Sequence, residues 1–152
     1  MQTGPPSHTL ICAARSQHVN TGPPHTHMPV IRQLTLPKDA NALGTIFGGV
    51  ILAQIDQAAA IEAHRHHVGR VVTVAMDGVE FKKPVEIGDL VSYFTSTRTV
   101  GRTSVAIDVH VWAQRQFAES GEFIPVTEAC VTMVAVDEDC KPIPLNRPQK
   151  QG

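Results

Sequence analysis

Apolar residues fill almost every position in one stretch of the chain, in contrast to the alternating patterns around it. From Gly48 to Ala63 the sequence GGVILAQIDQAAAIEA has few polar positions, and a helix of this composition must be buried on most sides. The run His64–His67 and then Gly69 follow, and both cations and glycine are typical of a helix C-terminus. We therefore expect one long helix that begins at the glycine pair and ends at a solvated histidine cluster.

Five other segments have the pattern of β-strands. One precedes the helix and alternates apolar with polar residues, and four follow it with short connections. The expected strands are Val30–Leu36, Arg70–Phe81, Leu90–Val100, Thr103–Arg115 and Pro125–Val136. This order predicts an α+β fold in which a curved antiparallel sheet wraps around one central helix. Because so apolar a helix needs cover on its second side, another copy of the chain is the simplest partner.

Composition separates a folded part from two ends. Residues 1–27 are rich in Pro, Thr and His and contain the repeat TGPP, a composition that cannot bury enough apolar area to become ordered. We expect a flexible tail over 1–27, one folded domain over 28–148 and a short C-terminal tail over 149–152. A chain of 152 residues is large enough for one hydrophobic core.

The charge balance and the cysteines exclude several classes of function. Thirteen Lys and Arg against 14 Asp and Glu give a formal net charge of −1, without the excess of basic residues that nucleic-acid binding requires. No apolar run reaches the roughly 18 residues of a membrane span. Cys12, Cys130 and Cys140 lack metal-site spacing, and their odd number favours a reducing, cytoplasmic setting. We expect no nucleic acid, membrane or metal among the partners.

An acid in the middle of the apolar helix requires an explanation. Burying Asp56 without a partner would cost several kcal/mol, so the carboxylate is either a hydrogen-bonded core acid or a functional group. Gly48 and Gly49 place backbone N–H donors at the start of the same helix, and Asn41 precedes them. An amide before the helix, donors at its start and a carboxylate in its middle are the parts that an acyl-transfer site needs.

Four motifs follow one another in an order that is specific to one family. They are LTLPKDANALGTIFGGVILAQID, RVVTVAMDGVEFKKPVEIGDLV, VGRTS and VTEACVTMVAVDEDCKPIPLNRP. With them the chain resembles the hotdog-fold acyl-CoA thioesterases, most closely the YciA-like broad-specificity bacterial branch, from about Val30 to Pro148. The resemblance implies a hotdog homodimer, commonly assembled into a trimer of dimers, that hydrolyses acyl-CoA to a carboxylic acid and coenzyme A without a cofactor.

The same resemblance assigns site residues. It places the family's acid on Asp56, its amide on Asn41 and its oxyanion-stabilising glycine on Gly48 or Gly49. Some hotdog thioesterases carry a hydroxyl group one turn after the acid, and Ala60 stands there in this chain. The resemblance therefore implies a complete site apart from that hydroxyl.

The chemistry of thioester hydrolysis agrees with these residues. Attack on the carbonyl develops negative charge on oxygen, which N–H groups at a helix start stabilise, while Asp56 acts as general base or as nucleophile. Gly49 and Asp56 are separated by seven residues of helix, about 10 Å, so one helix cannot present both to one carbonyl. Two antiparallel helices across a dimer axis can, so the mechanism predicts sites shared between subunits.

The phosphates of coenzyme A require cations and N–H donors at the rim of the site. Lys82 and Lys83 at a strand end, and the turn of Arg102, Thr103 and Ser104, are the candidates. The acyl chain is expected in an apolar slot between helix and sheet.

Other uses of the same fold remain as alternatives. A non-catalytic acyl-CoA sensor would more naturally lack the acid and carry a DNA-binding segment. Enoyl-CoA hydratases of this fold have a pattern with an Asp and a His near the helix start. This chain does not match that pattern, because no His lies between Met28 and His64. Hydrolysis of acyl carrier protein thioesters is disfavoured by the lack of a broad basic surface.

Overall fold

The computed structural model describes residues 27–115 and 121–146. Apart from residue 27, the two predicted tails lie outside these ranges. Within them the chain forms five strands, one long α-helix and one short 3₁₀ helix. In chain order they are β1 (Ile31–Leu34), η1 (Pro37–Asp39), α1 (Gly48–Ala63), β2 (Arg70–Asp77), β3 (Leu90–Val100), β4 (Ser104–Gln114) and β5 (Phe123–Val136).

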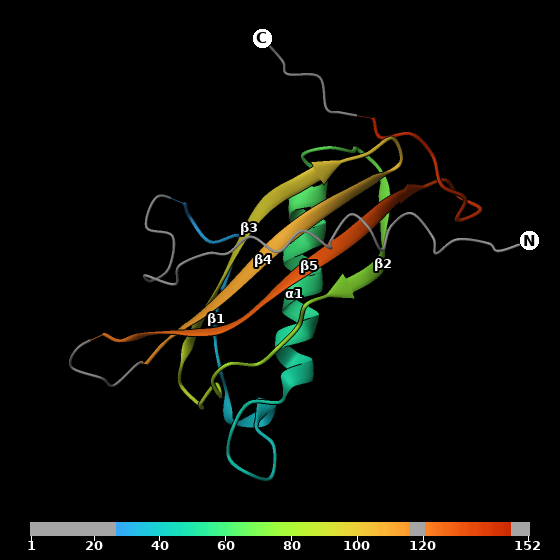
Figure 1. Cartoon of the computed structure of the whole chain (residues 1–152). Coiled ribbons are helices and arrows are strands. Elements are labelled where there is room, and N and C mark those ends of the chain that lie inside the picture. The colour runs from blue at the N-terminus through green and yellow to red at the C-terminus, as the bar shows by residue number, and fades with distance from the viewer. Residues whose placement is uncertain (1–26, 116–120, 147–152) are drawn as a thin grey trace, which may run out of the picture.

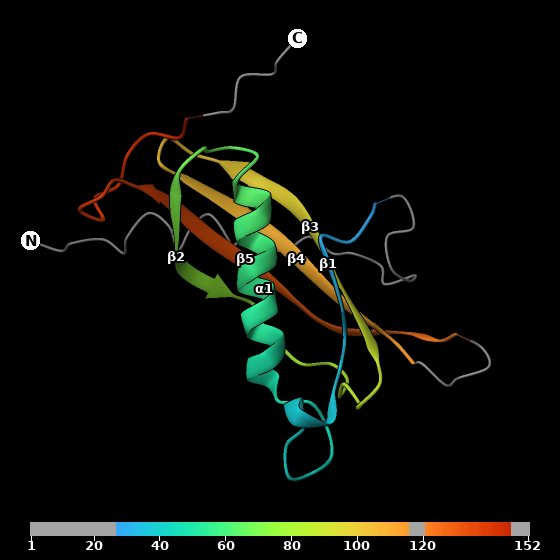
Figure 2. The same ribbon diagram turned by 180° about the vertical axis from the view of Figure 1, so that it is seen from behind.

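The strands form a single antiparallel sheet in the order β1-β3-β4-β5-β2. Figures 1 and 2 show this sheet curving around α1, which lies along its concave face. The predicted curved sheet around one central helix is therefore confirmed. Since β2 is hydrogen-bonded only to β5 among the described strands, its other edge is open.

The core forms where the inner face of the sheet meets the helix. Side chains alternate between the two faces of a strand, and the apolar side chains at every second position of β4 are all buried in this core: Val105, Ile107, Val109 and Val111. The largest fully buried side chains are Tyr93, Ile51, Ile55, Ile107, Val91, Val105, Val109, Val111, Val126, Val131 and Thr132. Each buried aliphatic side chain contributes about 1.5–3 kcal/mol.

The helix is buried on one side only, so the expectation of burial on most sides is wrong for the single chain. Positions Gly49, Ala53, Gln57 and Ile61, spaced every four residues, are exposed. Figure 2 shows this side of α1 with no other described element over it. In the described part of the chain, no helix has the length and apolar character needed to cross a membrane.

Other details also differ from the sequence expectations. The second strand ends at Asp77 rather than at residue 81, because the chain turns at Gly78 (φ 74°) and leaves the sheet. In the histidine cluster, His67 is buried and accepts a hydrogen bond from the Asn146 N–H, so the cluster is not a fully solvated helix end.

Candidate functional site

Asp56 lies on the exposed side of α1 and is held by a strand residue. Thr73 Oγ1 of β2 donates a hydrogen bond to Asp56 Oδ1 at 2.5 Å. A β-bulge at Val74 sits beside this contact. Val71 and Met76 both pack on the core, although residues five positions apart on a regular strand would lie on opposite faces. The extra residue of the bulge brings them to the same face. Thr73 was not among the site residues predicted from the sequence, because nothing in the strand pattern marks Val74 as the bulged residue.

The first turn of α1 presents free backbone donors. Phe47, the N-cap residue, provides no side-chain cap, and the first turn contains no acidic side chain. Among the described residues, the N–H groups of Gly48 and Gly49 have no hydrogen-bond partner. These donors stand at the positive end of the helix dipole, and their predicted part as oxyanion donors stays a prediction.

Asn41 shapes the loop that leads to α1. Its Oδ1 accepts hydrogen bonds from the backbone N–H groups of Leu43 (2.9 Å) and Thr45 (3.2 Å), and its Nδ2 donates to Thr45 Oγ1 at 3.0 Å. Within one chain, therefore, this amide fixes the entry to the helix. Its predicted part in positioning water or the carbonyl stays a prediction.

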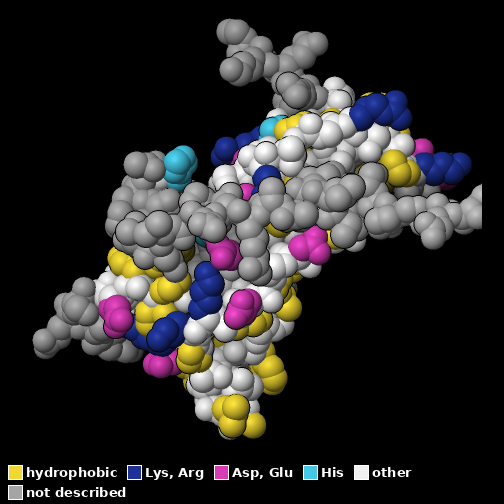
Figure 3. All heavy atoms as spheres, viewed as in Figure 1, with side chains coloured by type: hydrophobic (Ala, Val, Ile, Leu, Met, Phe, Trp, Pro, Cys, Tyr) yellow, Lys and Arg dark blue, Asp and Glu magenta, His cyan; other side chains and the backbone are white. Residues whose placement is uncertain are grey.

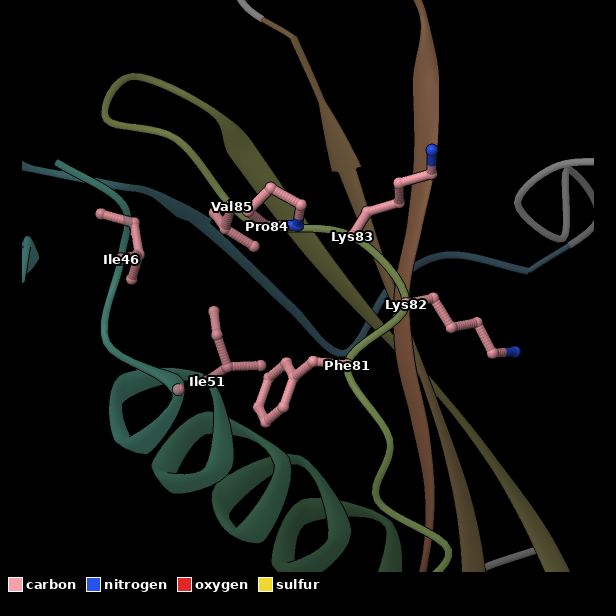
Figure 4. Close-up of a pocket in the computed structure, with 8 residues that line it drawn as sticks. Ile46, Ile51, Phe81, Lys82, Lys83, Pro84 and Val85 are labelled. Carbon is pink, nitrogen blue, oxygen red and sulfur yellow. The ribbon is translucent and has the colours of Figure 1, made fainter. Parts of the chain in front are cut away.

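A cavity of about 300 Å³ opens beside the start of α1. Its lining residues are Ile46, Gly48, Ile51, Phe81, Lys82, Lys83, Pro84 and Val85. Figure 4 shows the Phe81 ring against the first turn of the helix, while the Lys82 and Lys83 side chains point away from it. The two lysines therefore contribute only their backbone and inner side-chain atoms to an otherwise apolar wall.

A buried ion pair fixes the turn that follows this wall. Arg115 contacts the Asp89 carboxylate at 2.6 Å and donates to the Pro84 carbonyl at 3.2 Å. Thr35 Oγ1 donates to the Glu86 carbonyl at 2.7 Å. Burial raises the pKa of Asp89, although the Glu86 N–H and the Arg115 charge act in the opposite direction. The segment after Phe81 is thus held rigidly to the sheet.

The predicted coenzyme A contacts do not converge within one chain. Lys82 Nζ pairs with Glu128 at 3.0 Å, and Lys83 is exposed. The turn of Arg102, Thr103 and Ser104 joins β3 to β4 at the C-terminal end of α1, opposite the cavity (Figure 1). The 16 residues of α1 span about 24 Å, so the lysines near its start and the turn near its end are about that far apart.

The buried acid of α1 is Glu62, not Asp56. Glu62 is 5 % exposed and accepts hydrogen bonds from Thr95 Oγ1 (3.1 Å) and Thr97 Oγ1 (3.0 Å) of β3. The expectation that Asp56 is the acid inside the core is therefore wrong for the single chain. Glu62 is the satisfied structural carboxylate, and Asp56 is the accessible one.

Hydrophobic side chains also gather on the surface around this end of the molecule. Figure 3 shows them over the region where α1 begins, whereas charged side chains of both signs are interspersed elsewhere on this face. Phe47 and Leu43 are exposed in the loop before the helix. The helix start therefore lies next to apolar surface.

Comparisons with known proteins identify the family. The profile of the Thioesterase superfamily matches residues 43–116. The acyl-CoA thioester hydrolase YciA of Salmonella typhimurium is 43% identical over 117 residues, which cover 76% of this chain and 88% of that protein. A hexameric hotdog fold thioesterase of Campylobacter jejuni has a TM-score of 0.74 at 44% identity, covering 80% of this chain and 92% of that one.

Another solved structure is a hexameric broad specificity acyl-coenzyme A thioesterase in which one aspartate is replaced by alanine. It has a TM-score of 0.76 at 40% identity, covering 82% of this chain and 90% of that chain. Sequence and fold therefore agree over most of the length of these relatives. The chain belongs to the thioesterase superfamily, in the hotdog-fold branch of YciA and related acyl-CoA thioester hydrolases.

Proposed function

We propose that this protein hydrolyses acyl-CoA thioesters to a free carboxylic acid and coenzyme A in sites shared between two copies of the chain. The observation that carries the proposal lies on one helix. At its start the N–H groups of Gly48 and Gly49 have no hydrogen-bond partner within residues 27–115 and 121–146, and in its middle Asp56, bound by Thr73, is accessible. Oxyanion donors and a carboxylate are what the hydrolysis of a thioester needs.

The reaction follows from these groups. A water molecule attacks the carbonyl carbon, and Asp56 takes the proton that the water loses. The carbonyl oxygen becomes an oxyanion that accepts hydrogen bonds from the Gly48 and Gly49 N–H groups, and one such donor contributes about 10² to 10³ in rate. The tetrahedral intermediate then expels the thiolate of coenzyme A, which takes up a proton, and the acyl group leaves as the carboxylic acid.

The hydrogen bond from Thr73 leaves one oxygen of Asp56 for catalysis. With Oδ1 of Asp56 bound to the hydroxyl, Oδ2 is the oxygen left, either to accept the water proton or to attack the carbonyl carbon. If Asp56 were the nucleophile, attack of water on the aspartyl carbonyl of a transient anhydride would place solvent oxygen in its side chain, whereas a general base gains none. Mass analysis of the peptide containing Asp56 after a single turnover in ¹⁸O-labelled water tests for this label, and its detection would assign the nucleophilic role.

Two copies are needed because the parts are too far apart on one helix. Seven residues of rise separate Gly49 from Asp56 by about 10 Å. The exposed side of α1, with Ala53 and Ile61, and the open edge of β2 offer a continuous face for a second copy. An antiparallel pair of helices would place the donors of one copy opposite the acid of the other.

The same pairing also accounts for the separated coenzyme A residues. An antiparallel partner would carry its β3–β4 turn, with Arg102, Thr103 and Ser104, toward the cavity side of the first copy. Lys83 would then lie on the same side as that turn. We propose that the phosphates of coenzyme A contact Lys83 of one copy and Arg102, Thr103 and Ser104 of the other. We also propose a trimer of such dimers as the assembly, in line with the hexameric relatives.

Complementation between two inactive variants tests the shared site. Asp56→Asn removes the base, and Gly49→Val places a side chain at the oxyanion donors, where an added Cβ meets no atom within 4 Å. Both variants should fold and assemble but lose most of their kcat. In a refolded equimolar mixture, about one quarter of shared sites contain neither substitution, so activity returns to about one quarter of wild type.

The controls separate assembly from chemistry. Light scattering should give the wild-type mass for both variants. An Asp56→Asn enzyme with near wild-type turnover would remove Asp56 from the mechanism. A mixture as inactive as its components would show that each site lies within one chain.

A further inference from the structure

The cavity beside the start of α1 adjoins the proposed oxyanion donors, since Gly48 lines it, but its other lining residues take no part in the hydrolytic step described above. Its volume of about 300 Å³ is at the lower end of the range for small-molecule pockets, about 300–1,000 Å³. That space suits a single hydrocarbon chain and is too small for a whole coenzyme A molecule. The cavity therefore has the dimensions of a site for one part of the substrate.

The walls of the cavity select an apolar group. Ile46, Ile51 and Val85 form its inner side and are at most 6 % exposed. The Ile46 N–H donates to the Val85 carbonyl at 2.9 Å, so these two backbone groups satisfy each other. Because the ammonium groups of Lys82 and Lys83 point away from the helix (Figure 4), no charge enters the cavity from them.

Phe81 lines this cavity next to the free donors of the helix. A Cβ placed on Gly48 would be 3.2 Å from Phe81 Cζ, so the ring lies close to the residue that carries the first donor. The ring is nonetheless 45 % exposed, which leaves part of a large apolar surface uncovered. A carbonyl held at the Gly48 N–H would have its alkyl chain pass directly over this ring.

From this arrangement we propose that the cavity holds the acyl chain and that Phe81 is the residue that sets the preferred chain length. The proposal rests on the proposed function and adds the substrate determinant to it. The chain enters over the ring, covers its exposed part and extends toward Ile51 and Val85. The fixed Arg115 contact to the Pro84 carbonyl keeps the opposite wall from yielding to longer chains.

Two substitutions of Phe81 should move the selectivity in opposite directions. Phe81→Ala enlarges the cavity that the acyl chain fills, so a longer chain can be buried in it. Each further buried methylene group strengthens binding by about fourfold, so two groups give about 15-fold. The ratio of kcat/KM for long over short straight-chain acyl-CoA esters should rise by that factor. Phe81→Trp fills the slot and should lower the same ratio. The measurement is thiol release across a panel of esters.

Phe123→Ala is the matched control. Phe123 lies at the start of β5, is 42 % exposed and does not line the cavity, so its removal should leave the chain-length profile unchanged. If both Phe81 variants scale kcat/KM equally for every ester, Phe81 is a packing residue and the proposal is overturned. If the wild-type enzyme hydrolyses acyl-CoA and the Phe81 variants scale equally, this inference alone is refuted. If the wild-type enzyme hydrolyses no ester, the proposed function is refuted as well.

Discussion

The hydroxyl of Thr73 offers the sharpest test of the catalytic geometry. It donates to Asp56 Oδ1 from a bulged strand, and the two side chains come from different elements. Thr73→Val keeps the shape and the β-branching of the side chain but removes the donor. Asp56 would then keep its place on α1 while its carboxylate lost the contact that fixes its orientation.

The expected effect can be worked from this contact. A hydrogen bond to a charged group contributes about 1.5–3 kcal/mol, and the lower value applies here because both side chains are exposed in the single chain. About 1.4 kcal/mol corresponds to a factor of ten in rate. We therefore expect kcat to fall about tenfold. Since Thr73 does not line the substrate cavity, KM should stay within about twofold of wild type.

The assay is steady-state thiol release with kcat and KM determined separately. Thr73→Ser, which retains the donor, should recover most of the rate. Thr95→Val is the matched control, because it removes a hydroxyl that bonds the structural carboxylate Glu62 instead of Asp56. Wild-type kcat in Thr73→Val, or a serine variant no better than the valine one, would refute the positioning role.

Two further predictions concern stability. Glu62→Ala leaves two threonine hydroxyls of β3 without their carboxylate and should lower the free energy of unfolding, measured by urea titration, by about 2 kcal/mol. Substitution of the exposed Gln57 by alanine should change it by less than about 0.5 kcal/mol. Equal effects of the two substitutions would contradict the structural role of Glu62. Burial raises the pKa of Tyr93, the single tyrosine, so the native state keeps a proton that the unfolded state loses above about pH 10. Stability should therefore fall as the pH rises through that value, and tyrosinate absorbance should appear together with loss of circular dichroism; ionisation of an intact fold near pH 10 would contradict the burial argument.

The sequence by itself determined the elements and the family. The apolar run with its glycine pair gave the bounds of α1, because composition and helix-end residues are local to the chain. The alternation in β4 gave its inward-facing apolar residues, because a period of 2 residues is local as well. The ordered motifs gave the thioesterase family and the fold. Asp56 was singled out because it was expected to be buried, whereas it is exposed in the single chain, and its catalytic role stays a prediction.

The tertiary structure decided which groups meet. Asp56 and Glu62 are six residues apart, so they point about 120° away from each other around the helix, and an almost uniformly apolar sequence does not say which of them faces the sheet. The contact of Thr73 with Asp56 depends on a bulge, and the contact of Phe81 with Gly48 depends on where the chain leaves β2. These pairings join segments that are distant in sequence, and their geometry follows from how the sheet curves around the helix, which no local pattern encodes.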